Sequence, residues 1–267
     1  MNIIDFKHIT VDYGNGPVLH NITLQVKEGE HTVILGSNGS GKSTLMKLFS
    51  ADLYPSAKYP YTKRILGQER WNIWKLKKQL GMITHDLHYT FANQAQSIMG
   101  LDLVISGFHS SIGIFSHQGI TQKQKAQARE AMDMLDIGHL ATKMVQQMST
   151  GELRRAIIAR AMVHQPKALL LDEPTSGLDI KAQMEFVTMI RKLAKHVTIL
   201  LITHHIEEIF PEISQVVLLK QGNLFGHGEK ERLLTSEQLS QLFDTSLEVS
   251  CDERGWYRVS PIIRGAL

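Results

Sequence analysis

Residues 36–44 read Gly-Ser-Asn-Gly-Ser-Gly-Lys-Ser-Thr, a pattern of residue types that can hold a chain of phosphates. Glycines at this spacing allow successive backbone amides to turn toward one anion. The segment follows the apolar run 32–35, which predicts a buried strand, and the helix expected after it would direct its positive end at the same anion. Lys42 can then reach the β- and γ-phosphates, and the Ser43 hydroxyl can ligate Mg²⁺. The predicted nucleotide-binding residues are Gly36, Ser37, Asn38, Gly39, Ser40, Gly41, Lys42, Ser43 and Thr44.

Two adjacent carboxylates, Asp172 and Glu173, follow a second apolar run at 168–171. A carboxylate at the end of a buried parallel strand emerges at the sheet edge where ligands bind. We expect Asp172 to hold Mg²⁺ through water and Glu173 to polarise a water that attacks the γ-phosphate. An Asp-Glu pair alone would indicate only a surface turn, so this prediction depends on the phosphate loop at 36–43.

Hydrophobic patterning predicts the elements that position these motifs. Residues 3–26 alternate apolar and polar side chains around a turn at 13–16, which predicts antiparallel strands. The apolar runs 168–171 and 197–202 enclose a segment with helical periodicity, and strand, helix, strand in this order predicts a parallel sheet. A further helix and a strand at 216–219 are expected after these runs.

The middle of the chain, from about residue 90 to 165, is rich in Ala, Gln and Met and is predicted to be helical. Its clearest helix begins with Thr121 as N-cap and Gln124 three residues later, which is a capping box. This helix is expected to end near Ile137, with Gly138 as the stop signal. The economical interpretation is a helical lobe inserted into an α/β body.

A third motif lies between the first two, at residues 148–152, and reads Met-Ser-Thr-Gly-Glu. It resembles the signature of the ABC transporter ATPase family, usually Leu-Ser-Gly-Gly-Gln, and residues 3–230 as a whole are similar to an ATP-binding subunit of that family. A serine hydroxyl and glycine amides at a helix start suit an anion. The resemblance implies that this segment binds the γ-phosphate of ATP held by a second subunit, through Ser149, Gly151 and Glu152.

Two residues depart from the usual signature. The side chain of Thr150 narrows the approach to a phosphate, and Glu152 places a negative charge where the family has a neutral amide. A third departure is His85, which stands where the family has a Mg²⁺-sensing glutamine. A neutral imidazole can still accept a contact from water or a metal ion.

The resemblance assigns roles to further residues in family order. Tyr13 lies where the family stacks an aromatic ring on adenine, which suits a flat ring. His204 lies where the family places a switch histidine against the γ-phosphate, and residues 176–179 match the loop that contacts the opposite subunit. The implied catalytic residues are thus Glu173, His204 and Lys42, and the implied Mg²⁺ site comprises Ser43, Asp172 and His85.

The resemblance also implies the architecture: an α/β P-loop NTPase core of the ABC ATPase type, with an N-terminal antiparallel β subdomain and an inserted helical subdomain. We expect a single ABC ATPase domain over residues 1–235, with its catalytic core at 1–89 and 166–235 and its helical subdomain at about 90–165. Residues 236–267 would form a C-terminal tail. The family works as a head-to-tail dimer that closes on ATP, so a second ATPase subunit, in a homodimer, is the expected partner.

Composition limits the remaining functions. The formal net charge of +3 over 267 residues is too small for a dedicated nucleic-acid binder, so no direct nucleic-acid contact is expected. Cys251 is the only cysteine, which excludes an internal disulfide and suits a reducing compartment. The apolar runs are strand-sized, and Asp5 and Lys7 leave no room for a signal peptide. We therefore expect a cytoplasmic protein, peripheral on the inner face of the cell membrane, with integral membrane permease subunits as partners.

The cargo is the least constrained property. Residues 226–242 resemble the ATPase subunits of metal-chelate importers, and residues 104–113 resemble a branch associated with molybdate-type transport. Uptake of a metal chelate or an oxyanion is therefore one expectation. The alternative is a soluble ABC ATPase that acts on DNA or ribosomes, although the tandem cassettes, coiled-coil inserts and zinc-binding cysteines of those relatives are missing from this sequence. A small-molecule P-loop kinase would not explain residues 148–152 and 176–179.

Overall fold

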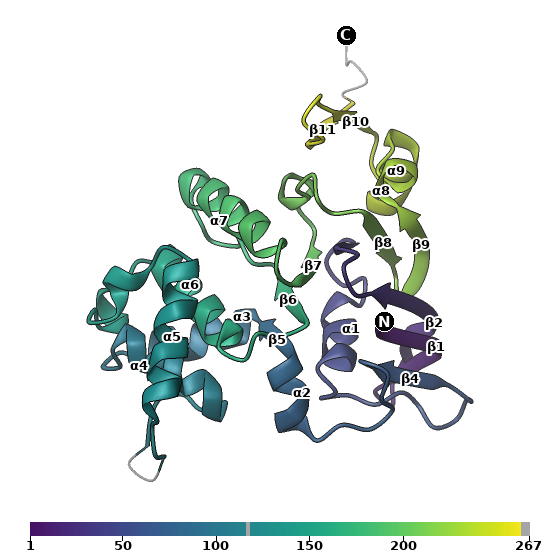
Figure 1. Ribbon diagram of the computed structural model, residues 1–267. Coiled ribbons are helices and arrows are strands. Elements are labelled where there is room, and N and C mark those ends of the chain that lie inside the picture. Colours follow the sequence, from purple (N-terminus) through teal and green to yellow (C-terminus); the bar gives the residue numbers. More distant parts are fainter. Residues whose placement is uncertain (116–117, 263–267) are drawn as a thin grey trace. The chain divides into compact units, whose positions relative to one another are not determined.

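The computed structural model describes residues 1–115 and 118–262 and divides into two compact units (Figure 1). One unit, here the N/C unit, consists of Met1–Trp71 and Thr198–Leu267, and the other, the middle unit, consists of Asn72–Val197. Each contains strands as well as helices, which agrees with the predicted α/β class.

The N/C unit opens with the predicted antiparallel strands. β1 (Asn2–Asp12) pairs with β2 (Pro17–Lys27) and with β4 (Thr62–Ile65), in the order β2-β1-β4. The inward-facing residues of β1 are almost completely buried, and the Phe6 ring lies 5.6 Å from the ring of Phe49 on α1 (Lys42–Phe49). This contact anchors the helix that follows the phosphate loop.

A second group of strands in this unit is parallel at its centre. β3 (Thr32–Leu35) pairs in parallel with β7 (Thr198–Thr203) on one side and with β8 (Gln215–Lys220) on the other, and β9 (Asn223–Glu229) adds antiparallel to β8. All four residues of β3 are buried, as expected for a strand covered on both faces.

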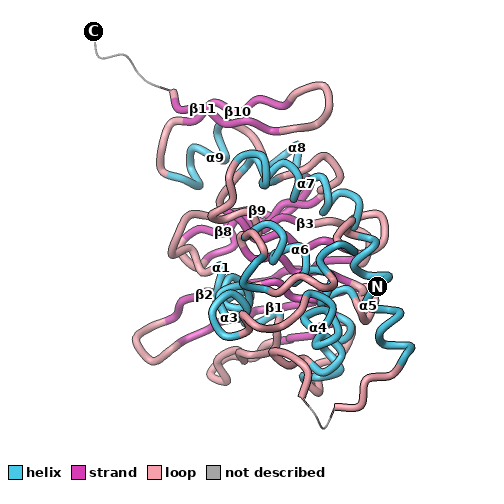
Figure 2. The backbone as a smooth tube through the Cα atoms, turned by 90° about the vertical axis from the view of Figure 1, so that its left-hand side faces the viewer, coloured by secondary structure: helices cyan, strands magenta, loops and turns pink. Residues whose placement is uncertain are grey.

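The helix predicted after His204 is wrong: only the single turn η4 (Ile206–Glu208) forms there. Ile209 is extended, with φ −78° and ψ 95°. Pro211 then disfavours helical backbone at Phe210, so the turn does not continue into a longer helix. Beyond β9 the chain forms α8 (Lys230–Leu233), α9 (Ser236–Phe243), β10 (Leu247–Cys251) and β11 (Tyr257–Pro261). α9 packs against β10, and β10 and β11 pair as an antiparallel hairpin that ends near the C-terminus (Figure 2).

The middle unit joins a strand pair to a helical region. β5 (Leu80–Ile83) and β6 (Ala168–Asp172) run parallel. α4, α5 and α6 pack against one another around buried residues that include Leu103, Ala128 and Ile157. The helices of the unit are α2 (Ile73–Gln79), α3 (His85–Gln94), α4 (Gly100–Ile105), α5 (Gln122–Met134), α6 (Thr150–Met162) and α7 (Ile180–Leu193), with short turns η1 (Ser106–His109), η2 (Gly138–Leu140) and η3 (Val145–Gln147).

The capping box at Thr121 is confirmed, since the Gln124 amide donates to Thr121 Oγ1 at 3.2 Å and the Thr121 amide donates to Gln124 Oε1 at 2.9 Å. The predicted end of this helix is wrong by three residues, because α5 stops at Met134. Asp136 adopts a left-handed conformation with φ 57°, and the Ile137 amide bonds back to Met132 O at 3.0 Å, which completes a Schellman motif. Asp136, rather than Gly138, therefore ends the helix.

Candidate functional site

The phosphate loop, residues 36–41, joins β3 to α1 in the N/C unit. Gly41 is the N-cap of α1 and has φ 104°, a conformation that other residues rarely adopt. A Cβ at Gly36 would lie 2.3 Å from Leu219 O, so only glycine fits where the loop leaves β3. The loop is thus held close to the sheet by two positions that exclude side chains.

Lys42 folds its amine back over this loop. Lys42 Nζ donates to Gly36 O at 2.8 Å and to Ser37 O at 3.1 Å, and the residue is only 6% exposed. The first turn of α1 contains no acidic residue, so nothing in that turn offsets the positive end of the helix dipole. Ser40 Oγ is also buried and has no hydrogen-bond partner among the described residues. A buried amine, an uncompensated helix end and a buried hydroxyl form a site for an anion.

Strand register places His204 at the same sheet edge as the phosphate loop. Leu35, the last residue of β3, pairs with Thr203, the last residue of β7. Gly36 and His204 therefore leave neighbouring parallel strands at the same level. The His204 ring lies 3.9 Å from the His205 ring between centroids, and the His205 amide donates to Thr203 Oγ1 at 2.9 Å.

Tyr13 follows the last residue of β1, and its side chain is 54% exposed. The β1–β2 turn begins there, where the Gly14 amide donates to Asp12 Oδ1 at 2.7 Å. The next strand approaches the phosphate loop, because a Cβ at Gly41 would lie 2.7 Å from Leu19 Cδ2. The open ring of Tyr13 thus projects from the hairpin that packs beside the loop.

In the middle unit the predicted carboxylates and His85 share one strand edge. Ile83 of β5 pairs with Leu171 of β6, so Asp172, the last residue of β6, and the backbone of His85 lie at corresponding ends of two parallel strands. Asp172 and Glu173 are both half-buried, and Glu173 has a left-handed backbone with φ 45°. A non-glycine residue in this conformation is held there by its surroundings. The His85 backbone begins α3, whereas its side chain lies outside the described part of the structure.

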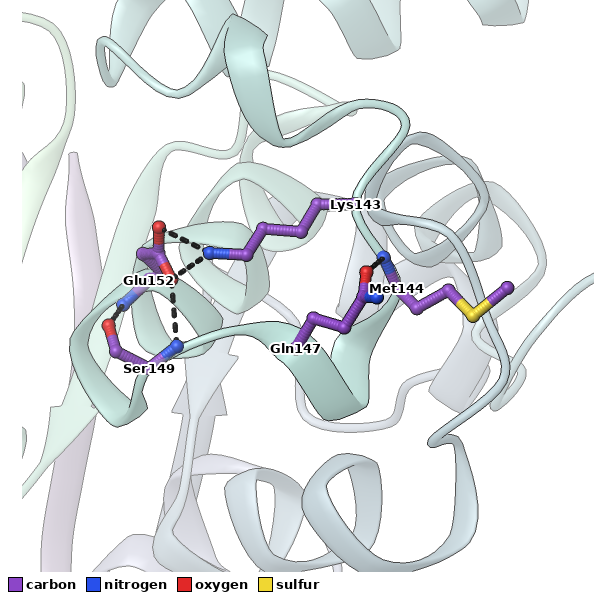
Figure 3. Close-up of polar contacts among 5 residues, drawn as sticks. All are labelled: Lys143, Met144, Gln147, Ser149 and Glu152. Atoms are coloured by element: carbon purple, nitrogen blue, oxygen red, sulfur yellow. Dashed lines mark hydrogen bonds and ion pairs between the residues drawn. The ribbon is translucent and has the colours of Figure 1, made fainter.

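The signature segment forms a capped helix start, as its resemblance implies. Ser149 is the N-cap of α6, with its Oγ accepting from the Glu152 amide at 3.2 Å. The Glu152 carboxylate returns to the Ser149 amide at 2.7 Å and also binds Lys143 Nζ (Figure 3). Gly151 has open surroundings, since a Cβ there would come no closer than 3.9 Å to Ala182 Cβ. Packing within the chain therefore does not require glycine at position 151.

Comparison with known families agrees with this geometry. A family model described as ABC transporter matches residues 19–176, which is more than half of the chain. The chain belongs to the ABC transporter family.

Full-length relatives extend this assignment beyond the matched residues. An ABC transporter ATP-binding protein of Bacillus subtilis, YlmA, is 30% identical over 256 residues, which cover 92% of this chain and 93% of the relative. The hemin import ATP-binding protein HmuV of Shewanella denitrificans is 27% identical over 249 residues, with 90% and 93% of the two chains covered. The chain is thus similar along nearly its whole length to ATP-binding proteins of the family.

A solved structure confirms the predicted fold class. A chain of an ABC transporter in an inward-facing conformation superposes with a TM-score of 0.80, at 23% identity and with 100% of both chains covered. The α/β P-loop ATPase fold of the family, with its antiparallel β and helical parts, is therefore the fold of this chain. No described helix is both long and apolar enough to cross a membrane.

Arg154 makes a contact between two of these motifs that the sequence does not predict. Its buried guanidinium donates to Pro174 O and, at 3.0 Å, to Ser176 O. These bonds tie the signature helix α6 to the loop after Glu173. In the same loop the Asp179 side chain caps α7 by accepting from the Ala182 amide at 2.8 Å. Lys143 was also missed, because an irregular segment separates it from Glu152 and no local pattern predicts their contact.

The predicted site residues fall into two groups. The N/C unit holds Tyr13, the phosphate loop with Lys42, Ser43 and Thr44, and His204. The middle unit holds Asp172, Glu173, the backbone of His85, and the signature. The roles that the family resemblance implies for these residues remain predictions.

Proposed function

We propose that this chain binds and hydrolyses ATP with Mg²⁺ and, in a dimer attached to membrane permease subunits, energises the uptake of a metal chelate or an oxyanion. The observation that carries the proposal is the phosphate loop, in which glycine packing, a buried Lys42 amine and the start of α1 converge. Membership of the ABC transporter family supports ATP as the nucleotide.

The nucleotide would be bound mainly through its phosphates. Amides of residues 38–44 and the Lys42 amine are the donors, and Lys42 would exchange its bonds to Gly36 O and Ser37 O for bonds to phosphate oxygens. The exposed Tyr13 ring offers a stacking surface for adenine.

Magnesium would be held jointly by the protein and the phosphates. Among residues 1–115 and 118–262, no group of three or more His, Cys, Asp or Glu side chains is placed to hold a metal ion. Mg²⁺ binds nucleotide sites through one or two protein ligands plus phosphates and waters. We assign the Ser43 hydroxyl, Asp172 and His85 to this role, and bound Mg²⁺ would neutralise phosphate charge during transfer.

Hydrolysis requires a base and a γ-phosphate contact. We assign Glu173 as the residue that orients and polarises the attacking water, because it follows the end of β6 directly and has the left-handed backbone that is common at functional sites. His204 leaves β7 beside the phosphate loop, and we assign its ring to the γ-phosphate. Lys42 would stabilise the charge that develops on the transferring group.

A second copy of the chain would complete each site. We assign Ser149, Gly151 and Glu152 to the γ-phosphate of ATP bound to the partner's loop. The support is that the amides of Thr150 and Gly151 precede the first intrahelical bond, from Leu153 N to Ser149 O at 2.9 Å. The open surroundings of Gly151 suit the close approach of a phosphate.

The transport role rests on the relatives. HmuV is described as a hemin import protein, which supports a metal chelate as cargo. The chain would lie on the cytoplasmic face of the membrane and reach the membrane only through its permease.

We also propose one ABC ATPase domain over residues 1–235. Its catalytic core would comprise 1–89 and 166–235, its helical subdomain would comprise about 90–165, and a tail would follow at 236–267.

Two experiments test this function. Purified protein should release phosphate from ATP, and Lys42→Ala should reduce the rate by about 100-fold, the effect typical of removing one charge-stabilising donor. Copurification from native membranes should recover a hydrophobic partner chain. Recovery of ribosomes or DNA instead would contradict transport and favour the soluble ABC ATPases.

A further inference from the structure

Glu152 poses an electrostatic problem for the proposed signature site. Its carboxylate lies in the first turn of α6, where the γ-phosphate of ATP would approach. Two negative groups near one helix end repel each other, although the helix dipole favours either one alone. The signature can accept ATP only if the charge of Glu152 is offset.

Lys143 supplies the opposite charge. Lys143 Nζ lies 2.9 Å from Glu152 Oε1 and 2.7 Å from Glu152 Oε2, so it bonds both oxygens (Figure 3). The exposed fractions of the Lys143 and Glu152 side chains are 32% and 27%, so the pair is partly shielded from water. Within residues 1–115 and 118–262, Lys143 forms no other ion pair, and its flexible stem reaches Glu152 from the segment between η2 and η3.

The capping box uses the amides of Ser149 and Glu152 but not those of Thr150 and Gly151. Glu152 Oε2 occupies the Ser149 amide at 2.7 Å, and Ser149 Oγ accepts from the Glu152 amide at 3.2 Å. Because Ser149 Oγ acts as an acceptor there, its hydrogen can be donated to an anion. The amides of Thr150 and Gly151 lie between these groups on the first turn.

We propose that Lys143 is a positioning residue for ATP, which neutralises Glu152 and holds it in the capping box so that the γ-phosphate can bind the signature. The proposal rests on the proposed function, in which the signature meets ATP bound to a second copy. Lys143 acts through Glu152 and does not itself contact the nucleotide. This role of Lys143 explains how the chain can have a glutamate at position 152, where the family usually has glutamine.

The protonation of Glu152 supports the same arrangement. Burial raises the pKa of Glu152, but the hydrogen bonds from Lys143 and from the Ser149 amide outweigh it, and the pKa lies below the usual value. The carboxylate is therefore charged at neutral pH, and a cation is needed to offset it.

The test is a double-mutant cycle between Lys143 and Glu152 in chains that carry Glu173→Gln, which slows hydrolysis. The measurement is the ATP concentration that gives half-maximal dimer by size exclusion. K143M should raise this concentration about tenfold, since screening limits a partly exposed charge pair. In chains that also carry E152Q, K143M should change it less than twofold, because no negative charge remains to offset. K143R, which keeps the charge, should stay within about threefold of the parent.

ADP binding to the monomer is the control for folding, because ADP lacks the γ-phosphate and would not meet the signature. K143M should leave the ADP dissociation constant unchanged. If K143M raises the half-maximal ATP concentration equally with and without E152Q, Lys143 touches the nucleotide or supports the fold, and the proposal is overturned. If K143M needs no more ATP than the parent for half-maximal dimer, the proposal on Lys143 is overturned, but the ATP-dependent dimer of the proposed function stands. If the parent, which carries Glu173→Gln alone, does not dimerise with ATP, the proposed function itself is contradicted.

Discussion

Helices α1 and α6 both begin at a proposed phosphate site, but the two helix starts are built differently. At α1, a left-handed Gly41, a close approach at Gly36 and the inward Lys42 leave little freedom, and the first turn has no acid. At α6, the glycine has open space and the first turn contains Glu152, which Lys143 offsets. The first site is specified by the backbone, and the second by side chains. We therefore expect mutations at the first to be severe and those at the second to be selective.

The largest expected effect is at Gly36. In Gly36→Ala the new Cβ would meet Leu219 O at 2.3 Å, and a backbone oxygen cannot move aside cheaply. We expect a loss of about 1–3 kcal/mol in the free energy of unfolding, together with loss of ATP binding. Urea unfolding and nucleotide titration measure the two effects, and unchanged unfolding would show that the loop is looser than this packing implies.

Gly151→Ala is the matched change at the other helix start. Its Cβ would meet only Ala182 Cβ at an ordinary 3.9 Å, so the free energy of unfolding should change by less than about 0.5 kcal/mol. The methyl group would instead obstruct the phosphate of a second copy and weaken the ATP-dependent dimer. Urea unfolding and size exclusion with ATP give the two readouts. A destabilised monomer would contradict the comparison, since it would make Gly151 a packing residue.

The smallest expected effect is a pH dependence at Glu152. Because the folded-state pKa of Glu152 is lowered, its stabilising contribution is complete above the unfolded-state pKa and is lost as the pH falls through the folded-state value. Wild type should therefore lose slightly more stability than Glu152→Gln between pH 6 and pH 3.5. Urea midpoints of the two proteins at both pH values test this, and parallel curves would show that the Lys143 pair does not bias protonation.

The same contrast explains what the sequence could predict. The phosphate loop depends on local backbone requirements, which a run of glycines before Lys42 displays directly, and strand register then follows from buried apolar runs. The partners of Glu152 and Arg154 could not be predicted, because Lys143 and Pro174 reach them across irregular segments. The end of α5 was misplaced for a related reason, since an aspartate, Asp136, took the left-handed position that glycine usually fills.

The central claim is that ATP is bound between two copies of this chain and hydrolysed with Glu173. The most direct measurement is size exclusion of Glu173→Gln with saturating ATP and Mg²⁺, with Glu173→Gln lacking nucleotide and the Lys42→Ala, Glu173→Gln double variant as controls. The account predicts a dimer for Glu173→Gln only when ATP is present, because blocked hydrolysis preserves the closed state. Only monomer under saturating ATP would contradict it.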